Sequence, residues 1–292
     1  MTQEPVRASF LYLARYVYSG DVAENDYILR VHPYQDEGQV PEHTQFLTSP
    51  SSSGAGYVDA YGSPVRRTSV AVPHRELIVA SSGRVRLYPL ETPLPEIPRS
   101  VSLPRAGLFP QFLSPSPLVD PDSVRERALE VADGDTGLVS LVDRISEWVH
   151  AGIEGHQKAT DITTTAAGVL RIRQGGSRDI THLALGMLRA LWIPCRYVSG
   201  LLIGEAGETH AWLEFWHPGA GWVGCDPTRN ISIVAGPDHV KFAVGRDYSD
   251  VAPVQSEYRD GCSGCLDQVV AEARLEEESI STDQALAALA PA

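Results

Sequence analysis

The sequence predicts an α+β protein in which a β-sandwich comes first and helices packed on an antiparallel sheet follow. Three observations predict this fold class. Short strand-like segments separated by turn residues fill the first hundred residues, helical periodicity covers residues 123–191, and alternation with a period of two begins after Pro194. The chain has 292 residues, which is enough for one large domain or two modest ones.

The first part of the chain is predicted to be an antiparallel sandwich, because its candidate strands are short and turn residues stand between them. The expected strands are residues 9–18, 27–34, 45–48, 56–61, 67–72 and 76–88. The last of these is expected to turn at Ser81-Ser82-Gly83, and the segment 50–56 is expected to be a flexible loop.

A proline-rich stretch follows, with eight prolines between residues 93 and 121. Proline lacks the N–H donor and interrupts regular structure, so this stretch indicates a linker or a strap across the surface. We place the domain boundary within it. The predicted division is an N-terminal sandwich over residues 1–110, a core domain over residues 111–258 and an acidic C-terminal tail over residues 259–292.

The core domain is predicted to begin with helices and to continue with strands. Apolar residues recur at helical spacing in segments 123–132, 137–153, 163–173 and 180–191. The last helix has the densest apolar stripe, formed by Leu183, Ala184, Met187, Leu188 and Leu191. Period-two alternation then predicts strands at residues 196–202, 209–216 and 221–225.

Composition excludes several classes of function. The net charge of −13 argues against binding to nucleic acid phosphates or to an anionic membrane surface, because both require clustered cations. No stretch reaches the roughly 18 apolar residues of a membrane span, and Arg15 interrupts the apolar N-terminus, so we expect a cytoplasmic protein. Nothing resembles a Walker loop or a dinucleotide fingerprint, so no cofactor is expected. The sequence does not indicate the oligomeric state.

Three segments carry residue types suited to nucleophilic catalysis, and the first contains Ser177. This residue follows Gly175-Gly176 and stands just before the helix with the densest apolar stripe. The positive end of a helix dipole stabilises negative charge, and the free N–H groups of a helix start can form an oxyanion hole. A serine between glycine and a helix is also a common N-cap, and that alternative stays open for this segment alone.

The other two segments contain His210 and Asp226. On an alternating strand, His210 shares a face with Trp212 and Glu214 and could act as a general base. Asp226 ends the next antiparallel strand, where its carboxylate could accept a hydrogen bond from the imidazole and fix the tautomer. Taken singly, the histidine could be an ordinary packed side chain, and Asp-Pro-Thr could be an ordinary turn.

Together the three segments resemble the transglutaminase-like superfamily, in which a nucleophile at a helix start precedes a His strand and an Asp strand end. Their spacings are 33 and 16 residues. The motifs that carry the resemblance are Gly176-Ser177-Arg178-Asp179, His210-Ala211-Trp212-Leu213-Glu214, Gly221-Trp222 to Asp226-Pro227-Thr228, the run 188–200 and Gly245-Arg246-Asp247-Tyr248. The resemblance covers residues 8–258, since the first half resembles the N-terminal sandwich of bacterial transglutaminase-like proteins.

The resemblance implies a papain-like core and a catalytic triad of Ser177, His210 and Asp226. It also implies that Gly176, Trp212 and Trp222 support the oxyanion or line the substrate cleft, and it implies no metal site. The expected function is acyl transfer or hydrolysis at an amide, peptide or ester carbonyl. The expected partners are a peptide, a protein or a small amide or ester substrate. A catalytically silent protein that binds a peptide or protein in the same cleft is the alternative.

The chain departs from the family at the nucleophile, because Ser177 stands where the family has cysteine. A thiol beside a histidine readily becomes a thiolate, whereas a serine hydroxyl stays protonated until a general base removes its proton during attack. Three explanations stay open: a Cys-to-Ser change introduced to silence the protein, a native serine enzyme, and a native pseudoenzyme that retains the fold for binding.

Other residues are weaker candidates for the chemistry. Cys195 and Cys225 are expected to be structural, since each stands within or beside a predicted strand. Cys262-Ser263-Gly264-Cys265 has the spacing of a metal-binding pair, but a zinc site needs four ligands and the sequence has no second pair. His239 could complete such a site, whereas His182 is expected to pack or to support the site rather than to catalyse.

Overall fold

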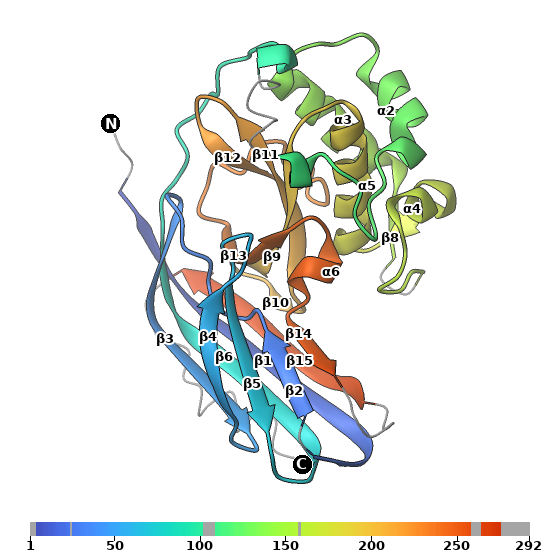
Figure 1. The fold of residues 1–292 in the computed structure, drawn as a ribbon. Coiled ribbons are helices and arrows are strands. Elements are labelled where there is room, and N and C mark those ends of the chain that lie inside the picture. Colours follow the sequence, from blue (N-terminus) through green and yellow to red (C-terminus); the bar gives the residue numbers. More distant parts are fainter. Residues whose placement is uncertain (1–3, 24, 102–108, 157–158, 258–263, 276–292) are drawn as a thin grey trace.

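The computed structural model describes residues 4–23, 25–101, 109–156, 159–257 and 264–275. Figure 1 shows a β-sandwich that contains the first and last described strands, with a separate sheet and its covering helices beyond it. This arrangement confirms the predicted fold class, in which a β-rich N-terminal part precedes helices packed on an antiparallel sheet.

The sandwich consists of two antiparallel sheets with the strand orders β10-β15-β1-β6-β3 and β14-β2-β5-β4. Their bounds are β1 Val6–Val22, β2 Asn25–Leu29, β3 Gln39–Ser49, β4 Ser53–Val58, β5 Pro64–Val70, β6 His74–Leu87, β10 Ala206–Gly207, β14 Val254–Glu257 and β15 Gly264–Leu275. Apolar side chains from both sheets fill the space between them. Phe10 of β1, Leu29 of β2 and Val79 of β6 are fully buried in this core.

The turn expected at residues 81–83 is wrong, because β6 runs through this segment without a break. Its residues pair with β1, with Gly83 opposite Phe10. A Cβ at Gly83 would lie 2.8 Å from the carbonyl oxygen of His43 and 3.0 Å from the Phe10 ring. The glycine therefore serves the close approach of neighbouring strands, which is the other common use of glycine in a strand.

The end of the described chain also differs from the expectation of a tail over residues 259–292. Residues 264–275 form β15, which pairs along β1 and has Ala271 and Ala273 in the core. Asp267 of the same strand is exposed to solvent. A strand that pairs along a sheet edge can therefore carry acidic residues on its outer face. The division at residues 110 and 258 stays a prediction, and residues 276–292 lie outside the described part.

The second sheet has the order β12-β11-β9-β13, and helices cover one of its faces. Its strands are β9 Cys195–Leu202, β11 His210–His217, β12 Gly221–Cys225 and β13 His239–Gly245. The helices are α2 Arg125–Ala132, α3 Leu138–Gly152, α4 Ala166–Ile172, α5 Ser177–Ala190 and α6 Tyr248–Val251. Short elements complete the fold: η1 Arg99–Val101, η2 Pro110–Phe112, η3 Asp122–Val124, β7 Glu154–Gly155 and β8 Gln174–Gly175. Within the described ranges, no helix is long and apolar enough to cross a membrane.

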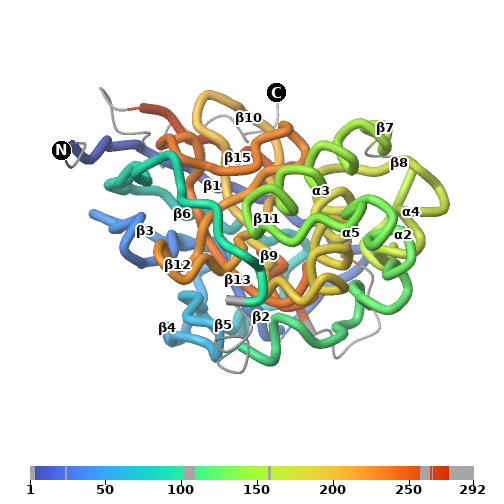
Figure 2. Tube along the Cα trace, turned by 90° about the horizontal axis from the view of Figure 1, so that it is seen from above, coloured from blue at the N-terminus to red at the C-terminus, as the bar shows by residue number. Residues whose placement is uncertain are grey.

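The central helix is α5, which is buried along nearly its whole length. Its apolar side chains, such as Leu183 and Leu188, join a core with Leu213 and Phe215 from β11. Figure 2 shows α2 to α5 gathered on one side of β9 and β11, with the sandwich strands on the other side. Both faces of this sheet are therefore covered, and all eight residues of β9 are buried.

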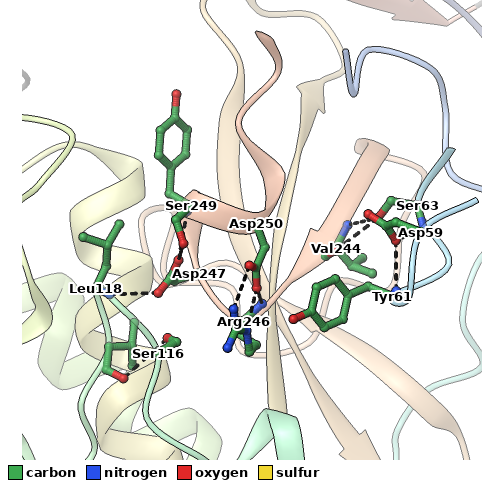
Figure 3. Close-up of polar contacts among 12 residues, drawn as sticks. Asp59, Tyr61, Ser63, Ser116, Leu118, Val244, Arg246, Asp247, Ser249 and Asp250 are labelled. Carbon is green, nitrogen blue, oxygen red and sulfur yellow. Dashed lines mark hydrogen bonds and ion pairs between the residues drawn. The ribbon is translucent and has the colours of Figure 1, made fainter. Parts of the chain in front are cut away.

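The turn between β13 and α6 ties the two parts together (Figure 3). In this turn, the carboxylate of Asp247 accepts a hydrogen bond at 2.8 Å from the backbone N–H of Leu118, which belongs to the helical part of the chain. On the sandwich side, the Ser63 hydroxyl accepts from the backbone N–H of Val244 at 2.9 Å and donates to the same residue's carbonyl. The family-like segment 245–248 is thus a structural junction.

Candidate functional site

Ser177 is the first residue of α5 and is partly exposed. The start of this helix is held by Asp179, whose Oδ2 accepts from the Gly176 N–H at 3.0 Å and from the Thr160 hydroxyl at 2.7 Å. A Cβ at Gly175 would lie 2.5 Å from the Asp179 side chain. Gly175 therefore leaves room for the Asp179 carboxylate, which fixes the turn before the helix. The helix begins at Ser177, three residues before the predicted start at residue 180.

His210 is the first residue of β11 and lies opposite Gly200 of β9. Its Nε2 lies 2.8 Å from Oδ2 of Asp226, and 12% of its side chain is exposed. The Trp212 ring is stacked on the imidazole, with 6.2 Å between the ring centroids. The hydrogen bond occupies Nε2, so Nδ1 is the nitrogen left to take a proton from a nucleophile.

Asp226 follows the last residue of β12 and is fully buried. Its Oδ1 accepts from the backbone N–H groups of Thr228 at 3.1 Å and Arg229 at 3.3 Å. Its Oδ2 accepts from His210 and from a second histidine, His239, at 3.1 Å. Burial alone would raise the pKa of Asp226, but the two histidine hydrogen bonds outweigh it and hold the pKa well below its ordinary value.

The topology brings the three predicted residues to one end of the sheet. α5 packs against β11, which pairs antiparallel with β9. The Thr181 hydroxyl donates to the carbonyl of Ala211 at 3.2 Å, one residue after His210. The His–Asp hydrogen bond is formed, whereas no hydrogen bond joins Ser177 to His210 in the described part of the chain.

Trp212 and Trp222 line a cavity of about 920 Å³ on the sheet face away from α5. The described lining includes neither Ser177, His210 nor Asp226. Trp212 connects the two regions, because its ring also stacks on His210. Trp222 instead packs on the guanidinium of Arg196, whose Cζ lies 4.5 Å from the ring centroid. The cleft role of both tryptophans stays a prediction.

A buried charge cluster lies in the same cavity. Glu214 accepts from Arg196 Nε at 2.6 Å and also pairs with Lys241. Lys241 in turn pairs with Asp36 from the sandwich side. Burial alone would raise the pKa of Glu214, but Arg196 and Lys241 lower it to about 2. The last residue of the His-Ala-Trp-x-Glu motif is therefore a structural carboxylate.

Sequence reasoning missed the contact of His239 with Asp226. His239 is the first residue of β13 and reaches the carboxylate across β9, where Gly200 has no side chain. A Cβ at Gly200 would lie 2.6 Å from the Trp212 ring. The only sign in the sequence was that His239 begins a segment of alternating residues. The neighbouring residues of His239 alone do not show that this segment pairs with β9.

His210, Asp226 and His239 could together hold a metal ion. Their ligand atoms lie within 4.8 Å of one another, and two imidazoles with one carboxylate form a set that zinc accepts. The same Nε2 and Oδ2 atoms are already joined by direct hydrogen bonds. A metal would have to replace both of these bonds.

The cysteines and His182 occupy structural positions where they are described. Cys195 and Cys225 are free and buried. Burial raises the pKa of the Cys195 thiol to about 11, and it also raises the pKa of Cys225. His182 is buried in α5 and accepts from the Tyr248 N–H at 3.2 Å, in line with a packing role. Cys262 lies outside the described residues.

Two family models match the chain. The model of the Transglutaminase-like superfamily matches residues 125–227, which include Ser177, His210 and Asp226. The model of the bacterial transglutaminase-like N-terminal region matches residues 11–86. The two matches follow the two structural parts in the same order.

Individual relatives agree with these matches. An uncharacterized protein of Mycobacterium leprae is 29% identical over 273 residues, which cover 89% of this chain and 96% of that protein. The protein-glutamine gamma-glutamyltransferase of Pseudomonas aeruginosa is 40% identical over 57 residues, covering 16% of this chain and 8% of that protein. A Cytophaga hutchinsonii structure, provisionally named a cysteine protease, superposes with a TM-score of 0.79 at 20% identity, over 96% of this chain and 94% of that chain. This last likeness shows the fold.

Proposed function

The chain belongs to the transglutaminase-like superfamily, and we propose that it performs acyl transfer or hydrolysis at an amide, peptide or ester carbonyl. The observation that carries the proposal is the 2.8 Å hydrogen bond between His210 Nε2 and the buried Asp226 carboxylate. It orients an imidazole at the end of the sheet where α5 begins. The name of the Pseudomonas aeruginosa relative supports a peptide or protein amide as the substrate.

In the proposed reaction the Ser177 hydroxyl oxygen attacks the carbonyl carbon while His210 Nδ1 takes its proton. The N–H groups at the start of α5 stabilise the oxyanion. The tetrahedral intermediate collapses, the bond to the leaving group breaks, and the leaving group takes the proton from His210. Water or an amine then releases the acyl group from Ser177, which yields hydrolysis or a new amide.

Asp226 has a defined part in this sequence. It stays ionised, because the histidine hydrogen bonds lower its pKa, and it accepts the Nε2–H of His210 throughout. This hydrogen bond fixes the tautomer that leaves Nδ1 free as the base. A serine hydroxyl needs such a base more than a thiol does, because it does not ionise in advance.

A silent binding protein is the second candidate, and one observation favours it. No hydrogen bond joins Ser177 to His210 among the described residues, so the nucleophile is not engaged with the base. The observation does not contradict the serine mechanism, because catalytic hydrogen bonds are often long in structures without substrate. Under the binding hypothesis, a peptide would occupy the cleft without reacting.

Labelling with a fluorophosphonate probe, followed by peptide mass spectrometry, distinguishes the serine enzyme from the silent binding protein. The proposed serine enzyme is labelled on Ser177, and the label is lost in Ser177→Ala and in His210→Ala. Absence of labelling under all conditions contradicts the serine mechanism. A parallel Ser177→Cys variant, assayed on a panel of peptides and esters, shows whether the site supports thiol chemistry. Activity confined to that variant would indicate a silenced cysteine site.

A further inference from the structure

Asp226 Oδ2 is shared by two histidines that come from strands on either side of β9. His210 begins β11 and His239 begins β13. A triad requires only the first of these contacts. The second places a further buried imidazole in contact with the same carboxylate oxygen.

His239 is the more deeply buried of the two histidines. Only 4% of its side chain is exposed, against 12% for His210. Its Nδ1 is buried and has no hydrogen-bond partner in the described residues. A proton on Nδ1 would be a buried N–H donor without an acceptor, which is unfavourable. The nitrogen that faces Asp226 is Nε2, at 3.1 Å, and it carries the proton of this hydrogen bond because a carboxylate can only accept.

His239 contacts both residues that hold His210 in place, Asp226 and Trp212. Its Nε2–H is bonded to the carboxylate that orients His210, and its ring lies edge-on to Trp212, with 4.8 Å between the centroids. Trp212 in turn stacks on His210. The absence of a side chain at Gly200 lets these rings meet above β9, since a Cβ there would lie 2.6 Å from Trp212.

We propose that His239 is a positioning residue that locks the Asp226 carboxylate in the orientation in which it accepts the His210 Nε2–H. The backbone N–H groups of residues 228 and 229 hold Oδ1, and His239 holds Oδ2 independently of His210. The carboxylate thus stays oriented when His210 moves to transfer a proton. This inference rests on the proposed function for its catalytic meaning, but the positioning itself can be measured without a substrate.

The test uses NMR of the 15N-labelled full chain, with the Nε2–H of His210 as the reporter. A His210→Gln variant assigns the signal. His239→Phe keeps a ring beside Trp212 but removes the N–H donor, whereas His239→Gln keeps an N–H donor and removes the ring. We expect a protected, low-field His210 Nε2–H signal in the native chain and in His239→Gln, and its loss by exchange in His239→Phe.

Either variant alone can decide the question. A folded His239→Phe that retains the native signal overturns the proposal, and so does a folded His239→Gln that loses it. His74→Leu is the matched control, because His74 is equally buried and bonds through Nε2 to Tyr27 at 3.1 Å, far away in the sandwich. This variant should leave the His210 signal unchanged, and a loss there would show that the signal reports only general stability.

A second readout separates this proposal from the proposed function. Fluorophosphonate labelling of Ser177 should slow about tenfold in His239→Phe and recover in His239→Gln, as expected for the loss of one hydrogen bond to a charged group. If the native chain is not labelled at all, the serine mechanism fails, and the NMR result still decides whether His239 positions Asp226.

Discussion

Replacing Glu214 by Gln is expected to destabilise the protein by about 3 kcal/mol at pH 7. The change keeps the shape of the side chain and removes its charge. It leaves the buried Arg196 and the partly buried Lys241 without their shared carboxylate. Breaking a buried ion pair from one side is costly because the remaining charge stays out of water.

The magnitude follows from the pKa of the carboxyl group. Arg196 and Lys241 overcome the effect of burial and lower the pKa of Glu214 from its ordinary value of 4.5 to about 2. At about 1.4 kcal/mol for each pKa unit, the charged form stabilises the folded state by about 3 kcal/mol. The independent range for breaking a buried pair, roughly 3–5 kcal/mol, includes this value.

The pH dependence has a defined sign. Because the pKa of Glu214 is lower in the folded protein, its stabilisation is complete above pH 4.5 and disappears as the pH falls towards about 2. At pH 3.5 roughly 2 kcal/mol should remain. Equilibrium unfolding in urea at pH 7 and pH 3.5, followed by tryptophan fluorescence, measures both free energies for the native chain and the Gln variant.

A matched control is Glu76→Gln, because Glu76 pairs with Arg15 at the surface and 41% of its side chain is exposed. Its loss should change the free energy of unfolding by less than about 1 kcal/mol. A Glu214→Gln effect as small as that of the control would refute the reasoning. An effect of equal size at both pH values would show that the loss comes from packing and not from charge.

Three further predictions concern the site and its supports, and two of them are substitutions. Asp226→Asn should slow Ser177 labelling at least about a hundredfold in kinetic assays, because the amide cannot hold the required His210 tautomer. Native Cys195 and Cys225 should resist iodoacetamide and react only after denaturation, as seen by mass spectrometry, because burial raises the pKa of both thiols. Gly200→Ala should lower the free energy of unfolding by about 1–3 kcal/mol and shift tryptophan fluorescence, because its Cβ would lie 2.1 Å from the Val240 carbonyl.

Each of these expectations has a contrary result. Undiminished labelling of Asp226→Asn would remove this carboxylate from the mechanism. Rapid alkylation of either thiol in the folded protein would mean that the strand carrying it opens readily. A Gly200→Ala protein of native stability would show that β9 and β13 can separate at no cost, and the close contact above β9 would then have no structural importance.

The pairing of His210 with Asp226 was predictable because it depends on local features. His210 begins one strand and Asp226 directly follows the next, a short connection joins the two strands, and alternation places both side chains on one face. The helices of the core were predictable for the same reason, since each has an apolar stripe of helical period.

The contacts that were not predictable join segments far apart in the chain. β15 pairs with β1 across more than two hundred residues, and His239 reaches Asp226 only because β13 lies on the far side of β9. Neither pairing has a local signature, because any strand with a suitable apolar face could cover an open edge. The role of Gly83 was misjudged for the same reason, since the neighbouring strand that demands a glycine is not adjacent in sequence.

The sequence by itself determined the fold class and the family motifs, because periodicity and short-range spacing are properties of the chain alone. It also proposed Ser177, His210 and Asp226 as the site, and their catalytic roles stay a prediction. The tertiary structure decided which of these residues touch, added His239 to the carboxylate, and returned the C-terminal strand to the sandwich. These contacts depend on which sheet edges and apolar faces are still uncovered when the whole chain packs, and this is fixed only in the folded protein.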